Sequence, residues 1–88
     1  MTRLTARETI QHIMKRAHVT SAHVAVRAGV TPQTIQAFIE KDKPLERMKI
    51  SYLLALAKEV KLPPTYLLSL IVDDLVDKEL KEWDSEEG

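Results

Sequence analysis

The chain has 88 residues, and 44% of them are hydrophobic. That is enough to form the core of one small domain, but it leaves no room for a second core. Only two glycines occur, which disfavours a strand-rich fold because such a fold needs many tight turns. The absence of cysteine excludes disulfides and thiolate metal sites, and we expect a cytoplasmic protein. The apolar runs are too short to cross a bilayer, so no membrane association is expected.

Basic and acidic side chains are unevenly distributed along the chain, although 13 of each give a formal net charge of zero. Residues 1–72 contain 11 Lys or Arg and 5 Asp or Glu, which gives a net charge of +6. Residues 73–88 contain 2 Lys and 8 Asp or Glu, which gives a net charge of −6. This asymmetry predicts a basic domain, 1–72, followed by an acidic helical extension, 73–88, with a frayed end.

The first expected helix covers about residues 5–18. Thr5 and Glu8 have the spacing of a capping box, which marks the start of the helix. Apolar side chains then recur at i, i+3, i+4 and i+7, with one more a turn earlier. They predict one buried face made of Ala6, Ile10, Ile13, Met14 and Ala17.

Two short helices are expected next, over about 20–28 and 32–39. Gly29 lies where the end of the first one favours a positive φ. Thr31 and Pro32 suit the N-cap and the first helical position of the second one. The three residues between the helices therefore predict a sharp reversal of the chain. The expected buried side chains are Val24, Ala25, Ala28, Ile35, Phe38 and Ile39.

The remaining chain predicts two more helices after a polar loop over 40–46. The fourth helix is expected over about 46–60, with an apolar stripe made of Ile50, Leu53, Leu54, Ala57 and Val60. The fifth begins near Pro63 and Pro64, and it either continues to about Trp83 or breaks near residues 73–74. Its apolar side chains are expected to belong to the core up to about Ile71.

The stretch 20–39 resembles the helix-turn-helix of the lambda-repressor-like family, which includes phage repressors, Cro proteins and xenobiotic-response-element-type regulators. Ala25, Gly29 and Ile35 have the family's spacing, and the similarity extends over roughly residues 4–70. It implies an all-α, five-helix DNA-binding domain, here with an extended C-terminal helix. It also implies a transcriptional regulator, a repressor in the first instance, that binds double-stranded DNA sequence-specifically.

In that family the second helix of the motif enters the major groove, so the resemblance assigns this task to residues 32–39. Gln33 is then the main candidate for base contact, because its amide can bond adenine in a bidentate way. Thr34 and Gln36 are further candidates for base contact. The candidates for phosphate contact are Ser21, Thr31, Arg16, Arg27, Lys41 and Lys43.

Proteins of this family usually bind inverted repeats as homodimers, because a single small domain contacts only a few base pairs. The apolar stripe of the last helix extends beyond what a monomer can cover, so it is the candidate dimer interface. Its residues are Leu68, Val72, Leu75, Val76, Leu80 and Trp83.

No pattern of catalytic residues is recognisable, so an enzyme is not expected, and neither is a cofactor. The spacing of His12, His18 and His23 does not predict a metal site. Two alternatives to a DNA-binding regulator remain. One is an adaptor or inhibitor that binds a protein through its C-terminal helix, and it stays open because residues 31–39 contain no Lys or Arg. The other is an antitoxin subunit that binds both DNA and a toxin.

Overall fold

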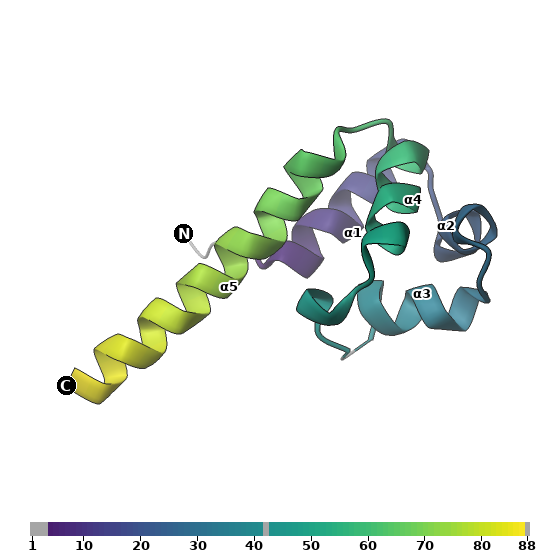
Figure 1. Cartoon of the computed structure of the whole chain (residues 1–88). Coiled ribbons are helices and arrows are strands. Elements are labelled where there is room, and N and C mark those ends of the chain that lie inside the picture. Colours follow the sequence, from purple (N-terminus) through teal and green to yellow (C-terminus); the bar gives the residue numbers. More distant parts are fainter. Residues whose placement is uncertain (1–3, 42, 88) are drawn as a thin grey trace.

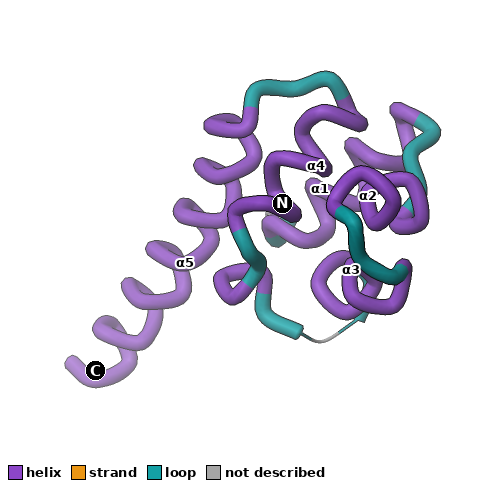
Figure 2. Tube along the Cα trace, turned by 45° about the vertical axis from the view of Figure 1, so that its right-hand side comes forward, coloured by secondary structure: helices purple, strands orange, loops and turns teal. Residues whose placement is uncertain are grey.

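The computed structural model describes residues 4–41 and 43–87, and within them the fold is entirely helical (Figures 1 and 2). This agrees with the all-α, five-helix architecture expected from the sequence. None of the helices in the described part of the chain is long and apolar enough to cross a membrane. The elements are α1 (Ala6–Ala17), α2 (Ser21–Ala28), α3 (Pro32–Ile39), the short 3-10 helix η1 (Leu45–Arg47), α4 (Ile50–Val60) and α5 (Pro64–Glu87).

Helix α1 begins as its sequence predicts. The hydroxyl of Thr5 accepts a hydrogen bond from the backbone N–H of Glu8 at 3.2 Å, which satisfies one of the free amides of the first turn. Ile10 and Met14 are buried against the other helices, and Ile13 is half-buried. The prediction that Ala17 is buried is wrong, because this last residue of the helix is exposed.

Three of the helices end in the same way, on a residue with a left-handed backbone. These residues are His18 after α1, Gly29 after α2 and Lys61 after α4, with φ values of 57°, 73° and 60°. After each one, the next N–H bonds back to a carbonyl in the last turn of the helix, as Val30 does to Ala25 at 3.0 Å. Only the glycine makes this turn without steric cost from a Cβ atom.

Helix α4 lies at the centre of the domain and packs against α1, α2 and α5 (Figure 1). It is therefore buried over a wide arc, which includes Tyr52, Ala55 and Leu56 as well as the expected Leu53, Ala57 and Val60. The predicted stripe was wrong at Ile50 and Leu54, which are 60% and 47% exposed. The predicted start was also wrong. Residues 45–47 form a 3-10 turn that buries Leu45, and α4 begins only at Ile50.

Helix α5 is one uninterrupted helix from Pro64 to Glu87, so the predicted alternative of a break near residues 73–74 is not realised. Its first half packs on α1, α4 and η1, and it buries Leu67 and Ile71. The prediction that its apolar side chains belong to the core up to Ile71 is wrong at Tyr66 and Leu68, which are 46% and 40% exposed. Its second half projects away from the other helices, which gives the molecule a length of 47 Å (Figure 1). The start of the acidic extension still lies on the domain, where Leu75 packs against the core, and only its C-terminal part points away from the basic domain of its own chain.

Candidate nucleic-acid interface

The reversal at Gly29 sets α3 across α2 and leaves one side of α3 open to solvent (Figure 2). The boundaries of α2 and α3 agree with the sequence prediction at nearly every residue. Thr31 occupies the N-cap position of α3, but its side chain does not bond to the backbone there. Its hydroxyl instead lies 3.1 Å from the hydroxyl of Thr34. This leaves the first amides of α3 without a side-chain cap from Thr31.

The two faces of α3 differ sharply in burial. Ile35, Phe38 and Ile39 are at most 3% exposed and anchor the helix in the core. Gln33 lies on the opposite face and is exposed. The other two predicted base contacts, Thr34 and Gln36, are half-buried, as is Ala37. The outward face of α3 is therefore polar but uncharged, and Gln33 is its most accessible amide.

Two side chains of α1 hold the chain just after α3 through hydrogen bonds to its backbone. Gln11 donates from Nε2 to the backbone carbonyl of Ile39 at 2.6 Å. Arg7 donates from its guanidinium to the carbonyl of Lys43 at 2.5 Å. These bonds join residues 28 and 36 positions apart in the sequence, so no local pattern could indicate them. Together they hold the C-terminal end of α3 in place.

The lysines beside α3 supply the positive charge that the helix itself lacks. Lys41 and Lys43 follow α3 directly, and both are exposed. The ammonium of Lys43 lies 4.6 Å from the centre of the Phe38 ring, a cation–π contact that directs this side chain toward the end of α3. Arg16, in the last turn of α1, is also exposed. These three side chains are accessible to an anionic partner.

Ser21 does not fit the phosphate contact expected of it. The residue is only 2% exposed, and its hydroxyl donates to the carboxylate of Glu40 at 3.2 Å. The side chain therefore joins the start of α2 to the end of α3, and it stabilises the angle between the two helices. The partner lies 19 residues further along the chain, so the sequence could not indicate it.

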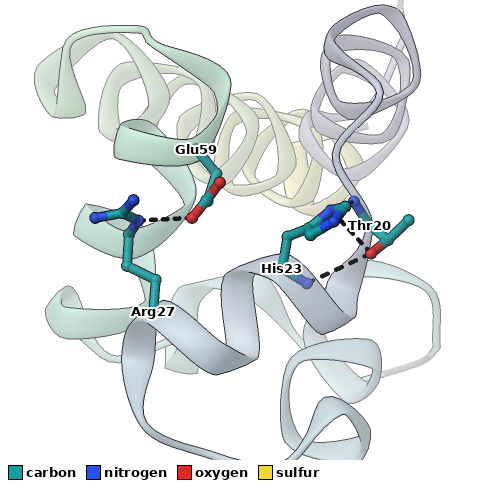
Figure 3. Close-up of polar contacts among 4 residues, drawn as sticks. All are labelled: Thr20, His23, Arg27 and Glu59. Carbon is teal, nitrogen blue, oxygen red and sulfur yellow. Dashed lines mark hydrogen bonds and ion pairs between the residues drawn. The ribbon is translucent and has the colours of Figure 1, made fainter.

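Two side chains of α2, Arg27 and His23, are each bonded to a neighbouring residue (Figure 3). Arg27 donates from Nε to Glu59 of α4 at 2.6 Å, so a phosphate would have to compete with this ion pair. The Nδ1 atom of His23 accepts a hydrogen bond from the backbone N–H of Thr20, and the backbone N–H of His23 donates to the Thr20 hydroxyl. This reciprocal pair is a capping box, which explains why His23 occurs in the first turn of α2.

The candidate dimer residues lie on α5, and all but one of them are freely accessible. Leu68, Val72, Val76, Leu80 and Trp83 are 40–55% exposed. Leu75 is the exception, because it is half-buried and packs against the core. The exposed set forms a continuous apolar stripe along the projecting helix.

Comparison with protein-family models, curated proteins and solved structures finds no match to this chain. The geometry therefore has to support any functional conclusion. The structure presents one polar, uncharged helix face around Gln33, anchored on its other side by apolar residues, with Lys41 and Lys43 exposed after the C-terminal end of the helix. The amide of Gln33 can donate and accept hydrogen bonds at the edge of a planar polar group, and the ammonium groups of Lys41 and Lys43 can attract phosphate.

Proposed function

We propose that this protein is a sequence-specific double-stranded DNA-binding regulator of the lambda-repressor-like helix-turn-helix type, acting as a repressor. The observation that carries the proposal is the exposure of Gln33 at the N-terminal end of α3, a helix whose other face is immobilised by Ile35, Phe38 and Ile39. A short helix anchored in this way can enter the major groove as a rigid unit. Gln33 would then bond the edge of an adenine.

Phosphate contacts in this proposal come from Arg16, Lys41 and Lys43, the exposed cations nearest in the chain to the ends of α1 and α3. Thr31 adds a hydroxyl beside the first amides of α3, and helix N-termini favour anions. These contacts position the protein without reading sequence. Affinity should then fall with salt by about 0.9 log units per log unit of salt for each phosphate neutralised.

The proposal includes a homodimer, since two copies of α3 could meet successive turns of the groove in an inverted repeat. The exposed stripe of α5 supports this part, because a helix face with five large apolar side chains at 40–55% exposure favours a partner.

Selection of bound duplexes from a random pool tests the proposal directly. We expect enrichment of an inverted repeat and a steep loss of affinity with salt. Gln33→Ala should weaken binding to the enriched duplex by about 1–3 kcal/mol, and it should relax the preference at one position of each half-site. Val26→Ala is the matched control, because Val26 is 82% exposed on α2 and is not among the proposed contacts.

A second candidate function is an adaptor that binds a protein through α5, because the exposed face of α3 has no positive charge to attract DNA. A folded protein that binds no duplex at low salt would overturn the DNA-binding proposal in favour of this adaptor.

A further inference from the structure

A groove of about 620 Å³ lies on the solvent side of α4, on a part of the domain that the proposed DNA contact does not use. Its floor is apolar and its edges include two cationic side chains. The residues that matter here are Leu54, Ala55, Leu62 and Pro64 for the floor, and Arg27 and Lys58 for the edges. A cavity of this size is within the range of pockets that bind side chains or small ligands.

The apolar part of this surface is unusually accessible. Leu54 is 47% exposed in the groove, and Ile50, one turn earlier on the same side of α4, is 60% exposed. Exposed apolar surface of this kind often marks a binding site. Lys58 is exposed beside it, and Lys61 follows at the end of the helix. Glu59 pairs with Arg27, and none of the described residues that line the groove is acidic, so Lys58 and Lys61 keep its surroundings positively charged.

The projecting half of α5 has the complementary properties. Val76, Leu80 and Trp83 are spaced i, i+4 and i+7, which places them on one helix face, and they are 47–55% exposed. Glu79 and Asp84 are exposed on the same segment. This pattern of anchors is the one by which an amphipathic helix binds an apolar groove. Its acidic surroundings match the cationic edges of the α4 groove.

The tail cannot reach the groove of its own chain. Pro64, the first residue of α5, lines the groove, and Trp83 follows 19 residues later in the same straight helix. At 1.5 Å per residue, this places Trp83 about 28 Å along the axis from the groove. In Figure 1 the C-terminal end of α5 lies far from α4, in agreement with this distance.

We infer that the C-terminal half of α5 from one copy binds the α4 groove of a second copy, with Val76, Leu80 and Trp83 on the apolar floor. This inference rests on the homodimer in the proposed function, but not on DNA binding. Exchange of both tails gives a closed, two-fold symmetric dimer with two identical contacts. Each acidic extension then lies beside the basic domain of the partner, which is where the opposite net charges of the two segments favour it.

Trp83 is the single tryptophan of the chain, so its fluorescence reports directly on this contact. We expect the emission to shift to shorter wavelength as protein concentration rises, together with a monomer-to-dimer change in sedimentation. Leu54→Glu should weaken the dimer by about tenfold or more and abolish the shift, while the helical circular dichroism is retained. Val26→Glu adds the same charge at an exposed site of α2 outside the groove, and it should change neither measurement.

Mixing two defective variants separates this arrangement from a dimer in which two α5 helices pair with each other. Leu54→Glu has an intact tail and a damaged groove, whereas Trp83→Ala has a damaged tail and an intact groove. Mixed together, they should form a heterodimer through one intact contact. A protein that remains monomeric at all concentrations overturns the inference. So does a Leu54→Glu variant that dimerises as the parent does, because its groove would then be unused. If a small amphipathic anion fills the α4 groove without changing the sedimenting mass of the protein, the tail of a second copy does not occupy the groove, and the inference is also overturned.

Discussion

Replacing Gly29 by alanine tests how the helix-turn-helix angle is held. Gly29 has φ 73°, and a Cβ atom built on it has no neighbour within 4 Å. The substitution therefore adds no clash, and its cost comes only from the backbone conformation. For an L-residue, a left-handed backbone costs about 1–2 kcal/mol. Alanine also lowers the conformational entropy of the unfolded chain, which offsets about 0.4–1 kcal/mol of this cost.

The net loss is about 1 kcal/mol, which lowers the Tm of a domain of this size by about 4–8 °C. Thermal unfolding followed by far-UV circular dichroism measures it. Lys61→Gly is the matched control, because Lys61 has φ 60° in the same role at the end of α4. Glycine removes the cost of the left-handed backbone at this position and raises the entropy of the unfolded chain, both opposite to the effects of Gly29→Ala. Lys61→Gly should therefore raise the Tm by a similar amount. An unchanged Tm for Gly29→Ala, or a lower Tm for Lys61→Gly, would refute this reasoning.

Two further substitutions and one control test the packing around α3. Ile35 is fully buried, so Ile35→Ala should cost about 2–5 kcal/mol in urea unfolding. Val26→Ala, at 82% exposure, should stay within about 0.5 kcal/mol of the parent, and a small effect at both sites would contradict the observed core. Ser21→Ala removes the hydrogen bond to Glu40 and should cost about 1 kcal/mol in the same assay. The affinity of the Ser21→Ala variant for DNA should depend on salt as that of the parent does. A smaller slope of log affinity against log salt would show that Ser21 contacts a phosphate after all.

The sequence predicts α2 and α3 well because their ends have strong local signals. Gly29 ends α2 and Pro32 begins α3, and both positions agree with the structure. Helix α4 was predicted less well because its burial depends on three neighbouring helices and not on one. A one-face stripe therefore missed Tyr52 and Leu56 and wrongly included Leu54.

The candidate site divides in the same way. The exposure of Gln33 follows from the helical periodicity of α3, which places Ile35 and Phe38 on the other side. The burial of Ser21 and the bonds from α1 to the end of α3 depend on contacts between residues far apart in the sequence. Helical periodicity is a local pattern and cannot predict such contacts. The projection of α5 was partly predictable, because the domain offers too little surface to cover an apolar stripe of that length.

The most direct test of the proposed interface is an NMR titration of isotope-labelled protein with the duplex enriched from a random pool. The backbone amides of Thr31, of residues 33–37, and of Lys41 and Lys43 should show the largest shifts, and the side-chain amide of Gln33 should shift with them. The amides around Leu54 in the α4 groove should not respond to DNA. Shifts confined to α4 and α5, or none in a folded protein at low salt, would contradict the claim that α3 reads DNA.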